Sequence, residues 1–220
     1  MGGAIGGMLG SAVGIAISPF PIIVMVLLLS TPRAKANGIA FALAWVATLT
    51  VVSAALVAGG GASTGGEPAR WTYWMKLGFG LLFLAIAVKQ WSARPRPGHT
   101  AKPPKFLATI DTFGAGKSAG LAVLLSAVSP KNLALIIAGA VAIASSPSSS
   151  GGKTVALILF VVIGSLCTLV PLAVFLLGGT KAAGVLDGWK TWMGAHNAAI
   201  VVVLCLVLGS KFIGEALTGL

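Results

Sequence analysis

A lysine lies deep inside an apolar stretch, in the motif Ser129-Pro130-Lys131-Asn132. An ammonium group near the bilayer centre costs at least about 2.5 kcal/mol on insertion scales, and ionisable residues at that depth are functional by default. Because proline interrupts a helix, Lys131 and Asn132 are expected to begin a new one, where the helix dipole favours an anion. The ammonium, the first-turn N–H groups and the Asn132 amide suit a carboxylate, sulfate or phosphate. The alternative is a neutral lysine, or one that reaches a water-filled crevice.

A second motif of the same kind, Ser18-Pro19-Phe20-Pro21, interrupts the first apolar stretch. It carries no charge, and the carbonyls that its prolines leave unpaired suit a cation or a hydroxylated headgroup; a purely mechanical kink is the alternative. Interrupted helices in corresponding positions of two halves point to the binding site of a transporter. The predicted substrate-binding residues are Ser18, Pro19, Phe20, Pro21, Ser129, Pro130, Lys131 and Asn132.

Other reactive groups are sparse in the apolar segments. The four carboxylates, at Glu67, Asp111, Asp187 and Glu215, all lie at or beyond segment ends, so a mid-membrane proton relay has no obvious member. There is no ATP-binding motif, metal-ligand cluster or nucleophile–base pair, so we expect no enzyme, no metal and no cofactor. The two cysteines, Cys167 and Cys205, lie inside apolar segments, and we expect buried structural thiols.

Composition places these motifs in a membrane. Of 220 residues 57% are hydrophobic and 9% charged, whereas soluble domains carry about 25% charged residues. The net charge of +11 comes from side chains in the connections, which is typical of topology signals and contact with anionic lipid rather than of nucleic-acid binding. Six segments reach the roughly 20 residues that a spanning helix needs: about 3–29, 38–58, 73–91, 117–144, 153–177 and 194–217.

The two halves correspond beyond the interrupted helices, since Trp74-Met75 opens segment three and Trp192-Met193 opens segment six. We therefore expect an all-α integral membrane protein with repeats at 1–91 and 117–220, joined by a Pro-rich basic cytoplasmic connection at 92–116. With three spans each, the repeats must have inverted topology. A glycine stripe on one face of segment one, which we expect to form a seam with segment four, comprises Gly2, Gly6, Gly10 and Gly14.

The basic residues predict the orientation. Ten of them flank the connections one–two, three–four and five–six, against four on the opposite side, at Arg70, Lys76, Lys153 and Lys211. The positive-inside rule then places the former connections in the cytoplasm and both termini outside the cytoplasmic membrane. The first segment has no basic leader and exceeds a signal-peptide core of about 7–15 residues, so we expect it to remain in the mature protein.

With these residues the chain resembles the lysine exporter (LysE) superfamily, and within it the actinobacterial glycolipid-addressing family of sulfolipid- and glycopeptidolipid-addressing proteins. The resemblance is carried by Ser18-Pro19-Phe20-Pro21-Ile22 after a Gly-rich start, by Ser129-Pro130-Lys131-Asn132, and by the Pro-rich basic connection. Thiol-electron carriers of the superfamily have a cysteine near each break, which this chain lacks.

The resemblance implies a cytoplasmic-membrane protein of mycobacteria or relatives that moves an anionic lipid or glycolipid towards the cell envelope. Export of a small, amino-acid-like solute is the alternative, because Lys131 would bind a carboxylate as readily as a phosphate. A non-transporting accessory role beside a lipid exporter is also left open. The expected partners are the lipid substrate and membrane lipids, with no nucleic acid; a homodimer and a lipid-synthesis or export partner are both open.

Overall fold

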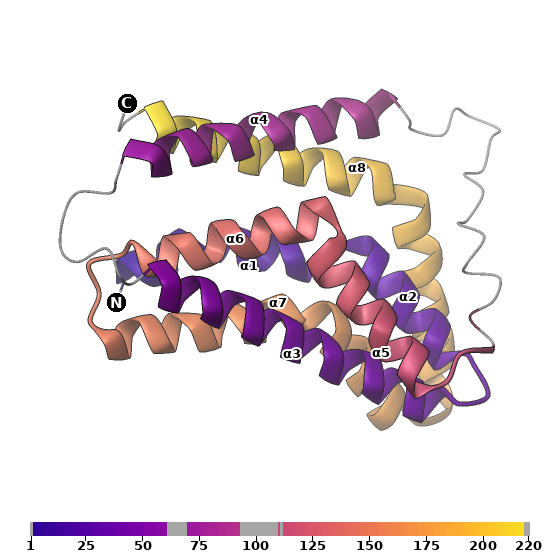
Figure 1. Cartoon of the computed structure of the whole chain (residues 1–220). Helices are drawn as coiled ribbons and strands as arrows, with labels where there is room; N and C mark the ends of the chain where they lie inside the picture. Colours follow the sequence, from indigo (N-terminus) through magenta and orange to yellow (C-terminus); the bar gives the residue numbers. More distant parts are fainter. Residues whose placement is uncertain (1, 61–69, 93–109, 111, 218–220) are drawn as a thin grey trace.

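The computed structural model describes residues 2–60, 70–92, 110 and 112–217, and every regular element within them is helical. Figure 1 shows these helices running largely along one common direction. The predicted connection at 92–116 lies mostly outside the described residues. The helices are α1 (Gly2–Ala16), α2 (Pro19–Leu29), α3 (Ala34–Gly60), α4 (Arg70–Ser92), α5 (Ala115–Val123), α6 (Pro130–Ala144), α7 (Ser150–Leu177) and α8 (Ala182–Leu217).

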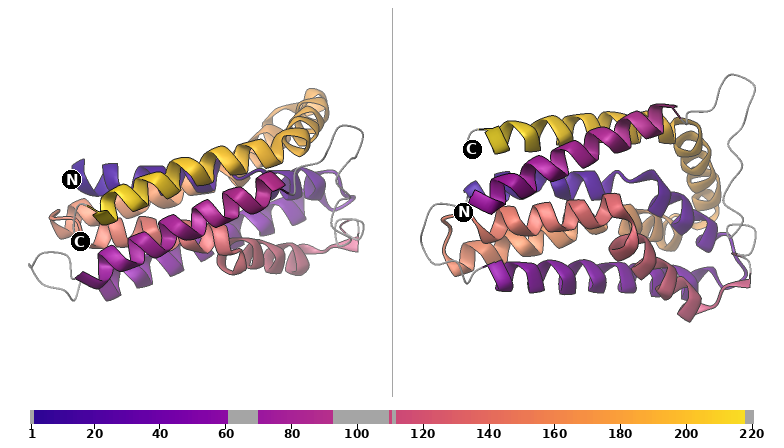
Figure 2. Two further views of the ribbon diagram at one scale, coloured as in Figure 1. Left: turned by 90° about the horizontal axis from the view of Figure 1, so that it is seen from above. Right: turned by 45° about the horizontal axis from the view of Figure 1, so that its top comes forward.

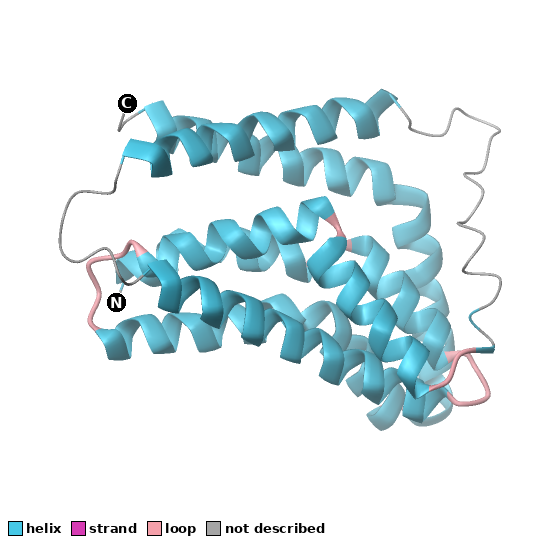
Figure 3. Cartoon of the chain, in the orientation of Figure 1, coloured by secondary structure: helices cyan, strands magenta, loops and turns pink. Residues whose placement is uncertain are grey.

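Both proline motifs break their helices. Ser18 has φ −65° and ψ 115°, and Ser129 has φ −64° and ψ 118°, so both residues are extended where a helix would continue. A following proline disfavours the helical conformation of the residue before it, and proline itself fits the first helical position. The axes of α1 and α2 therefore differ by 45°, and those of residues 115–128 and α6 by 65°. Figure 3 shows the second break as a short loop segment between two helices.

The two broken helices differ just before the break. α1 is regular up to Ala16, whereas α5 continues into a π-helical turn, Leu124–Val128. A π turn holds one residue more than an α turn, and such turns are frequent at functional sites.

Three described helices, α3, α7 and α8, are long and apolar enough to cross a membrane, and each bent pair adds one candidate span, giving up to five. The chain is therefore a multi-pass membrane protein. α4 is not in this set; its 23 residues pack along α8.

The sequence prediction was wrong about the start of the last helix. We expected a connection at 178–192, but a 3₁₀ turn, Gly179–Lys181, leads directly into the 36 residues of α8. The polar residues of this stretch suggested a loop, yet Asp187 and Lys190 form an ion pair three residues apart, which a helix accommodates. Ala182 and Leu186, four residues apart, are buried and anchor the start of this helix.

The helices pack as three layers, which are clearest in Figures 1 and 2. α4 and α8 form one layer, α1 and α6 the middle one, and α3 and α7 the third; α5 packs on α3, and α2 on α7 and α8. The α4–α8 contact is close because two glycines meet: a Cβ on Gly80 would lie 3.1 Å from the Gly209 carbonyl oxygen. Between α3 and α7, the buried Trp45 indole donates to the Gly164 carbonyl at 3.3 Å.

Candidate functional site

The two breaks meet inside the molecule. Lys131 Nζ donates a hydrogen bond to Ser18 Oγ at 2.6 Å, which joins the start of α6 to the start of α2. The Ser18 hydroxyl has one proton and two acceptors in reach, the Gly14 carbonyl at 3.1 Å and Asn132 Oδ1 at 3.3 Å. The bend of each broken helix therefore brings together residues that are 113 positions apart in the chain.

Asn132 holds the second break in shape. Its Nδ2 donates to the Leu125 carbonyl at 2.9 Å, from the first turn of α6 back into the π-helical turn. An interrupted helix leaves carbonyls without their usual partners, and a buried carbonyl without a partner is costly. Asn132 is buried, so its amide replaces a backbone donor that the break removes.

A cavity of about 270 Å³ lies at this meeting point. Seven of the eight predicted residues line it; Pro130 is the exception. The sequence analysis missed the residues that complete the lining from other helices: Ile86 and Gln90 of α4, Leu125, and Asn197 and Val201 of α8. Gln90 and Asn197 are amides that each lie within five residues of a tryptophan, and this signal alone could have marked them.

The charge balance of the cavity is positive. Among the described residues three ion pairs are found, Lys76–Glu215, Lys190–Asp187 and Lys211–Glu215, and none includes Lys131. The side chain of Lys131 is half-buried, and Lys131 lies in the first turn of α6, whose N–H groups have no acceptor within the helix. An anion in the cavity would therefore meet a cation that no described carboxylate neutralises.

The cysteines of the described residues lie apart from the Lys131 cavity. Cys167 and Cys205 are buried and unpaired, and neither lines the Lys131 cavity. No group of three or more His, Cys, Asp or Glu side chains that could hold a metal is found among the described residues.

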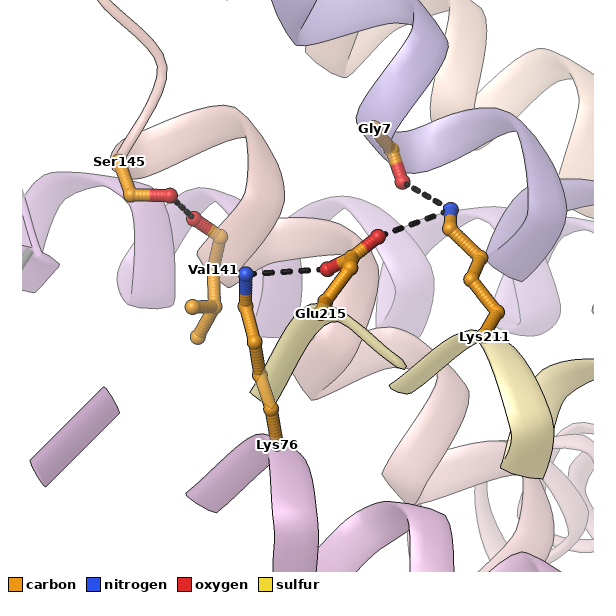
Figure 4. A network of polar contacts seen from close by, with 6 residues as sticks. All are labelled: Gly7, Lys76, Val141, Ser145, Lys211 and Glu215. Atoms are coloured by element: carbon orange, nitrogen blue, oxygen red, sulfur yellow. Dashed lines mark hydrogen bonds and ion pairs between the residues drawn. The ribbon is translucent and has the colours of Figure 1, made fainter. Parts of the chain in front are cut away.

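A second polar cluster lies at the end of the molecule where both termini are found (Figure 1). Lys76 of α4 is 3.0 Å from one Glu215 oxygen, and Lys211 is 3.7 Å from the other (Figure 4). Lys211 also donates to the Gly7 carbonyl of α1 at 3.3 Å. One carboxylate and two lysines, which we call the terminal ion cluster, thus tie α1, α4 and α8 together.

A comparison with known protein families gives a match over most of the chain. A family model described as Sap, sulfolipid-1-addressing protein, matches residues 8–218, which include both breaks and the whole cavity lining. No match was found among curated proteins or among solved structures. The matched region covers almost the entire chain, and the chain belongs to the sulfolipid-1-addressing protein family.

Proposed function

We propose that the protein binds the anionic headgroup of a lipid or glycolipid at Lys131 and moves that lipid across the cytoplasmic membrane towards the cell envelope. The observation that carries this proposal is the 2.6 Å contact of Lys131 with an uncharged hydroxyl, Ser18, in a cavity where no described carboxylate pairs with it. A buried cation is retained despite its insertion cost when it serves a substrate pathway. Membership of a lipid-addressing family supports a lipid as the substrate.

The architecture of the proposed transporter is a 3+3 inverted repeat with α4 as the sixth span. Three facts support it: the nearly equal backbone angles of Ser18 and Ser129, the packing of α3 on α5 and α6, and the corresponding packing of α7 on α1 and α2. Inverted repeats that meet at discontinuous helices form the substrate sites of many transporters. The chain resembles one transporter superfamily, that of the lysine exporter.

We further propose that both termini face away from the cytoplasm. The C-terminal ends of α3 and α8 lie at the side of the molecule where both chain termini are found, and the C-terminal end of α4 lies at the opposite side (Figure 1). Single cysteines placed at 92–116, in a background without Cys167 and Cys205, should react with membrane-impermeant maleimide only from the cytoplasmic side. Cysteines placed at 61–66 should react only from outside, and the reverse labelling would overturn this orientation.

Lys131→Ala tests the headgroup site. Purified wild-type protein should carry a stoichiometric anionic lipid in native mass spectrometry, and the variant should lose it while keeping its fold, because a charge-assisted hydrogen bond contributes about 1.5–3 kcal/mol. Lys131→Arg should retain part of the binding, since the charge stays but its shape changes. The matched control is Lys153→Ala, which removes another half-buried lysine, one that donates to the Ala144 carbonyl. Full lipid retention in Lys131→Ala would refute the proposal.

Export of a small anionic solute is the second candidate, and the modest cavity volume favours it. About 270 Å³ is just below the usual range of small-molecule pockets, about 300–1,000 Å³. A free carboxylic acid that binds in a Lys131-dependent manner, with no lipid co-purifying, would support this candidate over lipid movement.

A further inference from the structure

A long apolar groove runs between α1 and α8, separate from the Lys131 cavity. Its volume is about 550 Å³, and its lining is apolar apart from His196. Two members of the glycine stripe, Gly10 and Gly14, line it and let α8 approach α1 closely: a Cβ on Gly14 would lie 3.1 Å from Leu204 Cδ2. The sequence analysis expected the stripe to form a seam with segment four. α1 does pack on α6, and Gly14 lies between Leu135 of α6 and Leu204 of α8, whereas Gly10 faces α8.

Two residues of the groove lining, Gly10 and Gly14, lie next to the two cationic places of the molecule. At one end Gly14 lines the groove while the Gly14 carbonyl accepts the Ser18 hydroxyl of the Lys131 cavity. At the other end Gly10 lines it, and a Cβ there would lie 3.6 Å from Lys211 Nζ of the terminal ion cluster.

The outer wall of the groove is open to the membrane. Val207 is 62% exposed, and Val203 and Ile17 are exposed beside it. Such side chains in a spanning helix contact hydrocarbon, and each methylene group buried against an apolar surface contributes about 0.8 kcal/mol. A second apolar groove, of about 440 Å³, continues from Ile17 and Trp192 between α1, α2, α7 and α8.

We propose that the α1–α8 groove holds an acyl chain of the lipid whose headgroup occupies the Lys131 cavity. The inference rests on the proposed function and adds where the chain lies. The Gly14 carbonyl on the groove side accepts the hydroxyl of Ser18, which lines the cavity, so a headgroup beside Ser18 would lie next to the groove. Ile17, the residue before Ser18, lines the groove and would contact the attached chain. The apolar lining excludes the headgroup from the groove and accepts the chain.

The test uses a photoreactive lipid. The full chain is reconstituted in phosphatidylcholine vesicles with a small fraction of phosphatidylglycerol that carries a diazirine in the middle of one acyl chain. After photolysis, mass spectrometry of the peptides should place adducts mainly on residues 10–17 and 196–208, and few on the lipid-facing side of α3. Val207→Trp, which fills the groove, should lose most of these adducts. Val51→Trp is the matched control, a 67% exposed valine on α3.

Three results separate the possible outcomes. Adducts spread equally over α1, α3 and α8 would overturn the groove inference, and so would crosslinks showing that a second copy of the chain fills the groove. If Val207→Trp misfolds, as judged by size-exclusion chromatography, Val203→Trp provides the same test. Phosphatidylcholine that carries the same diazirine tests the role of the headgroup. If the yield of groove adducts is the same with both lipids and is unchanged by Lys131→Ala, the proposed function of Lys131 is refuted, while the groove remains an acyl-chain site.

Discussion

Asn132 combines two tasks in one side chain. Its oxygen lies 3.3 Å from Ser18 Oγ on the cavity side, and its nitrogen donates to the Leu125 carbonyl on the other. The sequence predicted its place in the site from the Ser-Pro-Lys-Asn order. Its bracing role could not be predicted, because the acceptor depends on a π-helical turn that no residue type specifies.

Asn132→Leu should remove the hydrogen bonds of the amide while leaving the charge of Lys131 in place. The leucine has a similar size, but the buried Leu125 carbonyl would lose its donor, at a cost of about 1–3 kcal/mol. We expect thermal unfolding in detergent to begin at a lower temperature. Asn197→Leu, on the opposite wall of the same cavity, is the control and should change unfolding much less. Equal stability of the two variants would show that the amide does not support the break.

At the scale of elements, apolar length and proline position predicted both broken helices at the observed residues. The same rules placed the start of α8 too late, because charge was taken as a mark of a loop, whereas Asp187 and Lys190 pair along one helix. Close contacts between helices escaped prediction too, since they depend on which glycine meets which neighbour in three dimensions.

Gly139 tests one such contact, between α6 and α7. A Cβ at Gly139 would overlap the Phe160 ring, lying 2.8 Å from its Cζ, so Gly139→Ala must push the two helices apart. We expect a loss of about 1–3 kcal/mol in the free energy of unfolding, measured by denaturant titration in mixed micelles. Gly120→Ala is the matched control: nothing lies within 4 Å of its Cβ position, and alanine should stabilise α5 by about 0.5–1 kcal/mol. A stabilising Gly139→Ala would contradict the close packing of α6 on α7.

For the whole molecule, the central feature is that the α4–α8 layer covers one side of the Lys131 cavity and is fastened at the terminal end. Ile86 and Gln90 of α4 and Asn197 of α8 line the cavity, while Lys76, Lys211 and Glu215 of the same two helices form the terminal ion cluster with α1. Movement of this layer would change access to Lys131, and the cluster resists that movement.

Glu215→Gln should loosen this fastening. Without the carboxylate, Lys76 and Lys211 repel each other across the α4–α8 contact, and removing one partner of a partly buried pair costs more than the pair contributes. Hydrogen exchange should become faster in the first turns of α1 and the last turns of α8. Asp187→Asn breaks an exposed pair within α8 and should leave both regions unchanged. Identical exchange in wild type and Glu215→Gln would assign the cluster no structural role.

The π-helical turn before Ser129 also bears on how the two halves differ. It holds one residue more than a regular turn and accommodates that residue within the turn itself. The extra residue therefore changes the local path of the chain just before Ser129 while leaving the hydrophobic length of the span almost unchanged. The first half, regular up to Ala16, has no such turn. Of the two broken helices, the one that carries Lys131 therefore has a backbone before its break unlike that of the one that carries Ser18.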